Sequence, residues 1–304
     1  MARSLTIATR GGALALAQTQ IVIAALQQRW PDLDCRIKVI TTHGDRDQRT
    51  ALWDLGGNLQ AEGFFTSQLE QALLAGEADV AVHSFKDLPT REVPGLEIGA
   101  VCDRQYPEDC LVTAHGVTSL EALPEAARVG TSSLRRAAQV RHLRSDLEVV
   151  ATRGNVETRL SKLDSGQVEA LILARAGLER LGLAGRISAV LDPRRFVPAA
   201  AQGALAVQVR AEDRDTVELV TAIDHTQTRL LAEAERQVLI CTGCGCHAPV
   251  GAFAEVVDGE VHLHAFMADP KGTHLVRRQA RGPLDRYQAL AQQTAAELVK
   301  ATSG

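Results

Sequence analysis

Short β-rich runs alternate with helical stretches over about the first two-thirds of the chain. Strand patterns occur at 5–10, 35–42, 78–84, 111–114, 128–130, 147–153 and 170–174, with helical patterns at 14–30, 65–75, 131–144 and 156–163. Repeated strand–helix units are typical of mainly parallel sheets covered by helices. The alternation therefore predicts an α/β fold for this part of the chain.

The last part of the chain, from about residue 226, has a different pattern. A long helical stretch at 226–240 precedes three β-like runs at 250–257, 260–267 and 274–281, and a helical stretch at 284–300 closes the chain. Asp258-Gly259 is a type I′ hairpin signal. The pattern predicts a small α+β domain with a three-stranded antiparallel sheet.

A short sequence echo links two distant strands. The segment 7–12 (IATRGG) resembles 150–155 (VATRGN), and each is a strand that ends in Arg-Gly before a helix. The echo suggests two similar α/β domains, each with an arginine at the carboxyl end of a strand, where ligands of open α/β sheets bind.

Composition excludes several classes of protein. The 304 residues contain no run of about 18 uncharged apolar residues, so we expect no transmembrane helix and no membrane partner. The net charge of −4 argues against general nucleic-acid binding. The N-terminus lacks the apolar region of a secretory signal, and the six cysteines therefore indicate reduced thiols and a cytoplasmic protein.

The segment 128–159 is strongly basic, with seven arginines against three acids. It contains GTSSLRR, which predicts hydroxyls and free N–H groups at a helix N-terminus, followed at once by Arg135 and Arg136. Helix N-termini attract anions, and arginine forks add charge-assisted hydrogen bonds. We interpret Arg135 and Arg136 as anion ligands, whereas Arg141 and Arg144 fit a solvated basic helix face.

Two further motifs point to chemistry. Lys86-Asp87 in HSFKDLP follows the buried strand 78–84, and is either a surface pair or a carboxylate in a cationic cleft that moves protons or stabilises a cation. The cluster Cys241, Cys244 and Cys246 lies on a Gly-rich loop. It lacks the second cluster of a zinc site and the spacing of a haem site, so no metal is expected. A chance thiol cluster and a nucleophilic or covalently modified cysteine both remain open.

These motifs together resemble the porphobilinogen deaminase (hydroxymethylbilane synthase) family, almost from end to end. The resemblance is carried by IATRGGALALAQ, GFFTSQLEQALLAGEADVAVHSFKDLP, VGTSSLRRAAQ, TRGNVETRLSKLDSG, LARAGLERLGL, VPAAAQGALAVQ, AERQ, and Cys246 before HAPVG. It implies a transferase that condenses four porphobilinogen molecules head to tail, releasing ammonia, to give the linear tetrapyrrole hydroxymethylbilane. It also implies a dipyrromethane cofactor, built from substrate and held by a thioether to one cysteine.

The resemblance implies a fold of two α/β domains like the lobes of type II periplasmic-binding proteins, plus the small C-terminal α+β domain. Domain 1 is expected at 1–103 and 203–222, domain 2 at 104–202, and domain 3 at 223–304. The active cleft is expected between the two lobes, with Cys246 reaching into it from domain 3.

The resemblance also assigns roles to residues at matching positions. Asp87 matches the catalytic aspartate, which assists loss of ammonia and stabilises the resulting cation, and Lys86 matches the lysine beside it. The expected cofactor ligands are Cys246, Lys86, Ser84, Ser132, Ser133, Arg135 and Arg136. The expected substrate ligands are Arg10, Thr131, Arg153, Arg159, Arg180, Gln202 and Phe65. The arginines are expected to hold the acetate and propionate groups of substrate and cofactor.

This sequence departs from the family pattern at several positions. Gly12 replaces a usual serine, Cys244 and Ala201 replace glycines, Gln208 replaces an acid, and residues 58–62 lengthen a loop near the site. None of these changes removes Cys246, Asp87 or the arginines. They bear on the rate and on cofactor loading rather than on the reaction class.

Partners follow from the same resemblance. The substrate is porphobilinogen, the product passes to uroporphyrinogen-III synthase in tetrapyrrole (haem, chlorophyll and corrin) biosynthesis, and the protein is expected to be a monomer. Two alternatives remain, which are a non-catalytic two-lobed binding protein for a small di-acid and a family member with impaired activity.

Overall fold

The computed structural model describes residues 3–41, 66–114, 116–243, 248–269 and 271–302. The described part divides into two compact units. The first takes in the described residues up to Gln105 together with Gly203–Arg229, and the second takes in Tyr106–Gln202 and the chain from Leu230 on. The three-domain division expected from the sequence stays a prediction.

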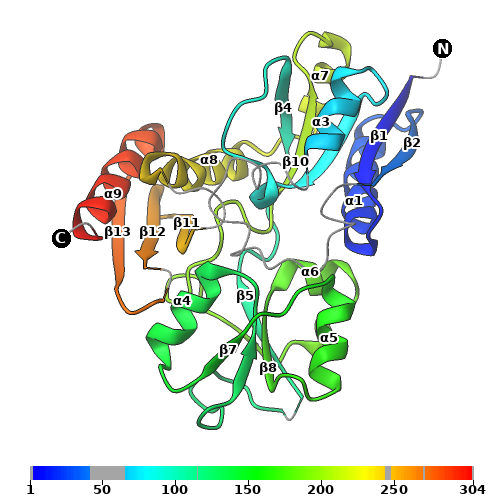
Figure 1. Ribbon diagram of the computed structural model, residues 1–304. Coiled ribbons are helices and arrows are strands. Elements are labelled where there is room, and N and C mark those ends of the chain that lie inside the picture. The colour runs from blue at the N-terminus through cyan, green and yellow to red at the C-terminus, as the bar shows by residue number, and fades with distance from the viewer. Residues whose placement is uncertain (1–2, 42–65, 115, 244–247, 270, 303–304) are drawn as a thin grey trace. The chain divides into compact units, whose positions relative to one another are not determined.

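The first unit is built on a five-stranded sheet of order β2-β1-β3-β10-β4. Figure 1 labels β1, β2, β4 and β10 of this sheet. Its strands are β1 (Ser4–Arg10), β2 (Asp34–Ile40), β3 (Val80–Ser84), β4 (Leu96–Val101) and β10 (Leu205–Arg210). Its helices are α1 (Ala13–Arg29), α3 (Ser67–Leu74), the short 3₁₀ helix η1 (Phe85–Asp87) and α7 (Arg214–Thr221).

Alternation along the strands sends side chains to two separate cores in this unit. Ile7, Val80 and Val82 pack in a cluster with Val22 and Leu26 of α1 and residues of α7. Ala8 and Ala81, one position along, pack instead with Leu69 and Leu73 of α3. Helices therefore cover both faces of the sheet, as the near-continuous apolar character of 78–84 predicts.

The second unit contains a sheet of matching order, β7-β6-β8-β5-β9. Its strands are β5 (Asp109–Thr113), β6 (Arg128–Gly130), β7 (Glu148–Val150), β8 (Ala170–Ala174) and β9 (Ala189–Val190). Its helices are α4 (Leu134–Leu143), α5 (Val156–Asp164), α6 (Arg175–Arg180) and the 3₁₀ helix η2 (Ala184–Arg186). The structure therefore has the two periplasmic-binding-protein-like α/β sheets that the resemblance implies.

Both sheets are mixed rather than mainly parallel, which corrects the sequence prediction. β1 pairs in parallel with β2 and β3, but β10 runs antiparallel to β3 and β4. In the second sheet β5 likewise runs antiparallel to β8 and β9. β10 comes from a part of the chain outside the predicted strand–helix repeats, and β5 corresponds to the predicted strand at 111–114, whose local pattern does not show its direction.

The sequence echo pairs strands that are not equivalent. Arg10 ends β1, the second strand of its sheet, whereas Arg153 follows β7, an edge strand. The counterpart of β1 by sheet order is β6, which leads into Thr131. The two sheets therefore share the same strand order, but the shared Thr-Arg-Gly sequence lies at or just after the ends of strands at different positions in that order.

The C-terminal part has the predicted α+β form, with a sheet of order β11-β12-β13. Its elements are α8 (Thr226–Thr242), β11 (Val250–Val257), β12 (Glu260–Ala268), β13 (Leu275–Pro283), the 3₁₀ helix η3 (Leu284–Arg286) and α9 (Tyr287–Thr302). The expected type I′ turn is confirmed by the positive φ angles of Asp258 (51°) and Gly259 (80°). One face of the sheet packs on α8 and α9, and Phe253 and Phe266 pack with Ala138 of α4.

None of the helices in the described part of the chain combines the length and apolar character needed to cross a membrane.

Candidate active site

The expected catalytic residues lie at the carboxyl edge of the first sheet. β1 and β3 are parallel neighbours, so Arg10 at the end of β1 and Ser84 at the end of β3 lie at one edge. The short helix η1 follows Ser84 at once and carries Lys86, which is half-buried, and Asp87, which is exposed. Phe85, between Ser84 and Lys86, is buried and its N–H donates to the Ala204 carbonyl (3.1 Å), which fixes the turn.

Polar contacts beneath this edge hold β3 in place. Nε2 of Gln18, on α1, donates to Oγ of Ser84 at 2.8 Å. His83 is buried and lies 3.1 Å from Oε1 of Gln208 on β10. Burial, with a further effect from the positive charge of Arg10, lowers the pKa of His83 to about 4, although the Gln208 contact opposes this. His83 is therefore neutral at neutral pH and leaves Arg10, Lys86 and Asp87 as the charged groups of this motif.

Gly12 is the N-cap of α1, and this helix consequently has no side-chain cap. The usual serine of the family would supply a hydroxyl here, as Ser133 does for α4. The departure therefore removes one polar group two residues from Arg10, while α1 still begins at Ala13.

The carboxyl edge of the second sheet gathers the hydroxyls of GTSSLRR. Thr131 and Ser132, which follow β6, are buried, and the Ser133 side chain accepts from the N–H of Arg136 as the N-cap of α4. The predicted hydroxyl-capped helix start is therefore confirmed. Arg135 and Arg136 lie in the first turn of α4, and their side chains return toward the sheet rather than to solvent.

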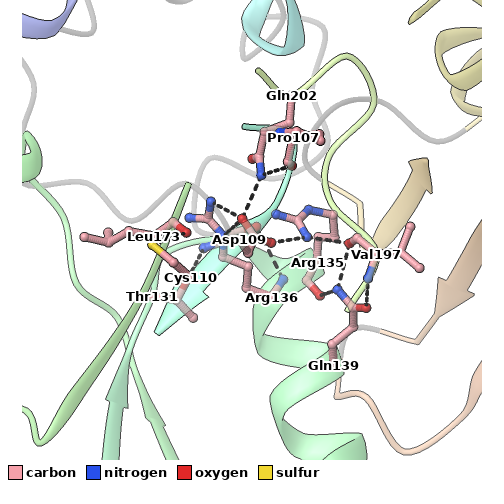
Figure 2. A network of polar contacts seen from close by, with 11 residues as sticks. Pro107, Asp109, Cys110, Thr131, Arg135, Arg136, Gln139, Leu173, Val197 and Gln202 are labelled. Atoms are coloured by element: carbon pink, nitrogen blue, oxygen red, sulfur yellow. Dashed lines mark hydrogen bonds and ion pairs between the residues drawn. The ribbon is translucent and has the colours of Figure 1, made fainter. Parts of the chain in front are cut away.

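A buried carboxylate that sequence reasoning missed lies between these two arginines. Asp109, the first residue of β5, is fully buried; its Oδ2 lies 2.8 Å from Nη1 of Arg135, and its Oδ1 lies 2.7 Å from Nη2 of Arg136. Gln202 donates from Nε2 to the same Oδ1 and to the Pro107 carbonyl, both at 2.9 Å. Figure 2 shows the carboxylate at the centre, with both arginines and Gln202 directed at it.

The two guanidinium groups hold the pKa of Asp109 well below its usual range, against the opposing effect of burial. Asp109 is therefore ionised throughout the physiological range. The signal in the sequence was an aspartate at the start of the apolar run 109–112, and only the antiparallel direction of β5 brings that position to the arginine edge.

Several buried polar atoms near this edge lack hydrogen-bond partners among the residues that the structure describes. Oδ2 of Asp109 is one, although it forms an ion pair with Arg135, and two others are Oγ of Ser132, after β6, and Nη1 of Arg153, after β7. Buried polar atoms almost always have a partner, so a bound group is expected to supply it. The serine and arginine atoms can both donate, and a carboxylate oxygen is a suitable acceptor. This donor set fits the carboxylate-rich dipyrromethane cofactor implied by the sequence.

The remaining predicted ligands are placed as follows. Arg159, half-buried on α5, donates from Nε to the Gly154 carbonyl at 3.0 Å. Arg180 ends α6, which follows β8 directly. Gln202 is buried and turned inward to Asp109, rather than simply presented to a ligand. Cys246 and Phe65 lie outside the described residues, as do residues 58–62 and Cys244. Cys241 is described, and its thiol is free and exposed.

One basic residue was misinterpreted. Arg144 was expected on a solvated helix face, but its guanidinium donates to the carbonyls of Leu120 (2.9 Å), Glu121 (2.9 Å) and Leu123 (3.1 Å) and pairs with Asp146. Its side chain is only 19% exposed. Arg144 therefore fixes the 120–123 segment against the end of α4, a contact between distant segments that helical spacing does not reveal.

Two family models and the curated relatives match this chain over nearly its whole length. The family models described as "Porphobilinogen deaminase, dipyromethane cofactor binding domain" and "Porphobilinogen deaminase, C-terminal domain" match residues 5–218 and 229–300. The porphobilinogen deaminase of Desulforudis audaxviator is 46% identical over 304 residues, covering 100% of this chain and 97% of that protein. The porphobilinogen deaminase of Deinococcus radiodurans is 43% identical over 298 residues, covering 98% and 96%. Among solved structures, the methionine binding protein MetQ matches 74% of this chain and 92% of that one, with 12% identity and a TM-score of 0.44.

Proposed function

Because the chain belongs to the porphobilinogen deaminase family, we propose that its two sheet edges divide the work of that reaction between them. The chain is a hydroxymethylbilane synthase, a transferase that joins porphobilinogen units with release of ammonia in tetrapyrrole biosynthesis. Its cofactor is dipyrromethane. The edge of the first sheet performs the proton chemistry and supplies some of the ligands for carboxylates, and the edge of the second supplies the rest.

The observation that carries this assignment is the donor set on the second edge. Arg135 and Arg136 lie in one helical turn with a single carboxylate between them, and Ser132 Oγ and Arg153 Nη1 are buried donors in need of acceptors. Each pyrrole unit carries an acetate and a propionate, so a growing chain of them matches these donors. Arginine forks bind carboxylates in two-pronged fashion, which fixes orientation as well as position.

Dipyrromethane, when bound through Cys246, supplies the nucleophilic α-carbon to which the incoming unit is joined. The residues of this chain position both partners. Ser132, Ser133, Arg135 and Arg136 hold the cofactor's carboxylates together with Lys86 and Ser84, and Arg10, Thr131, Arg153, Arg159, Arg180, Gln202 and Phe65 serve the substrate.

Asp87 is the proposed catalytic residue. It is exposed at the end of η1, directly after a strand that is pinned on both sides, so its carboxylate is available to a ligand while its backbone is fixed. A carboxylate here stabilises the cation left when ammonia departs and accepts the pyrrole proton afterwards. Lys86 beside it attracts the substrate's acidic groups.

We further propose that the chain works as a cytoplasmic monomer, that its product passes to uroporphyrinogen-III synthase, and that residues 1–103 with 203–222, 104–202, and 223–304 form three domains. The absence of a membrane-spanning helix among the described residues is compatible with the first of these.

Intact mass spectrometry tests the proposal most directly. We expect the purified chain to carry an adduct of dipyrromethane size, either as isolated or after incubation with porphobilinogen, and to release hydroxymethylbilane. A chain that gains no adduct and makes no product would overturn the proposal and would favour a non-catalytic di-acid binding protein.

A further inference from the structure

The charges in the buried network around Asp109 do not balance. The Arg135 and Arg136 side chains are 6% and 7% exposed, and the carboxylate between them is 0% exposed. No second acid pairs with either arginine in the part of the chain that the structure describes. Two buried positive charges therefore share one buried negative charge, and the network carries one unit of excess positive charge.

The two carboxylate oxygens of Asp109 contact different arginines. Oδ2 binds Nη1 of Arg135, while Oδ1 accepts from both Nε (3.1 Å) and Nη2 (2.7 Å) of Arg136. Gln202 Nε2 donates to Oδ1 of Asp109, and Nη1 of Arg135 also donates to the Val197 carbonyl at 2.6 Å. One carboxylate thus contacts both guanidinium groups and holds Arg136 through two of its nitrogens, with Nη1 of Arg136 outside the pair.

The two buried arginines repel each other electrostatically. Burial lowers the pKa of Arg135, Arg136 acts in the same direction, and Asp109 opposes both. A buried charge without compensation is strongly destabilising, and removing one partner of a buried pair has the same effect. The cofactor-free chain therefore depends on Asp109 more than a chain whose arginines have a second anion.

We propose that Asp109 is a positioning residue that acts as the standing counter-charge of Arg135 and Arg136, and that the second counter-charge is a carboxylate of the bound cofactor. This inference rests on the proposed function, in which those arginines hold dipyrromethane. Asp109 aligns the pair before loading, and loading completes the charge balance. Stability and cofactor loading are therefore coupled through this one carboxylate.

The test is a double-mutant cycle on thermal stability. The four proteins are the loaded chain and the cofactor-free Cys246→Ser chain, each with and without Asp109→Asn, a substitution that keeps the shape and removes the charge. In the cofactor-free background we expect Asp109→Asn to lower Tm by about 6–15 °C, the range given by the loss of a buried ion-pair partner in a domain of this size. In the loaded background we expect a loss smaller by at least about 5 °C, because the cofactor supplies a second anion.

Glu169→Gln is the matched control. Glu169 forms a two-pronged ion pair with Arg128 at the start of β6, away from the carboxyl edge. Its loss is expected to change Tm equally in the loaded and cofactor-free chains. Equal losses for Asp109→Asn in the two backgrounds would overturn the inference.

A charge-restoring variant decides the case in which Asp109→Asn does not fold or does not load. Adding Arg136→Gln returns the buried network to one excess positive charge, and we expect it to raise Tm above that of Asp109→Asn alone. A double variant no more stable than the single one would refute the counter-charge role. The unmodified chain distinguishes failure of the proposed function from failure of the role given to Asp109. If it gains no adduct, the proposed function fails, whereas an adduct without coupling removes only the role of Asp109.

Discussion

His83 and Gln208 face one another across the antiparallel strands β3 and β10, with Nε2 of the histidine 3.1 Å from Oε1 of the glutamine. Gln208 occupies a position where the family usually has an acid, so this histidine has a neutral partner in place of a charged one. With the ring buried and Arg10 acting on it, the pKa of His83 falls to about 4.

This pKa predicts a loss of stability in mild acid. The unfolded chain binds a proton at His83 near pH 6.5, and the folded chain does so only near pH 4, so the contribution is present above pH 6.5 and is lost as the pH falls toward 4. The difference between the pKa of His83 in the unfolded and folded chains corresponds to at most about 3 kcal/mol of unfolding free energy. Denaturant unfolding of the unmodified chain and of His83→Gln across this range measures it, and the variant is expected to show the flatter profile.

The pKa of Glu70 is shifted upward, so its contribution to stability changes with pH in the opposite direction to that of His83. The unmodified chain must therefore be compared with His83→Gln. Burial raises the pKa of Glu70, so its contribution is present at low pH and is lost as the pH rises. The difference between the two chains isolates His83. Parallel profiles for the unmodified chain and His83→Gln would contradict the prediction.

Asp87→Ala is expected to abolish most turnover while leaving the fold intact. Its side chain is exposed, so the unfolding free energy should change by no more than about 0.5 kcal/mol. Loss of a group that moves protons lowers kcat by about 10²–10⁴-fold. Steady-state kinetics and thermal melts check both parts, with Asp32→Ala, an exposed aspartate before β2, as the control. Substantial remaining turnover would refute the assigned role.

Cysteine substitutions test the attachment site. We expect Cys246→Ser to lose the dipyrromethane adduct, and Cys241→Ser and Cys244→Ser to retain it, because only Cys246 matches the attachment position. Intact mass after incubation with porphobilinogen gives the answer directly. An adduct that persists in Cys246→Ser, or that disappears in Cys241→Ser, would move the attachment to another thiol.

Arg153→Gln is expected to weaken ligand binding without weakening the fold. No hydrogen bond or ion pair of its guanidinium is found among the described residues, and its Nη1 is buried. Loss of a charge-assisted hydrogen bond to a ligand raises KM about tenfold to a hundredfold. Arg128→Gln is the counterpart, since it breaks the pair with Glu169 at the far end of β6 and should lower Tm but not raise KM. The same KM for Arg153→Gln and the unmodified chain would exclude the ligand contact.

Local patterns predicted most of the elements and the start of the site. Burial and capping depend on neighbouring residues and can be recognised from a short stretch of sequence. They predicted the strands 128–130 and 170–174 and the helix after Ser133, which the structure confirms. The strands β4, β9 and β10 were not predicted. β9 is only two residues long, too short for any periodicity.

Contacts between distant segments could not be predicted in this way. Asp109 meets Arg135 and Arg136 because β5 enters the sheet against the direction of β8, and Arg144 meets the 120–123 carbonyls because of where α4 ends. Neither relation has a fixed spacing in the sequence. The family resemblance assigned Arg135 and Arg136 to a ligand, but it gave no reason to look for a carboxylate between them.

The reversed direction of β5 has a consequence for how such a site is varied. A strand that runs against its neighbours delivers its first residue to the edge where they deliver their last, so the acid and the bases of this edge arrive on independent segments of chain. A shift of β5 by one residue would move the acid away from the helix that carries the bases and would also turn the buried side chains of the strand to the other face. The charge of this edge therefore depends on the register of one strand as well as on which residues the chain contains.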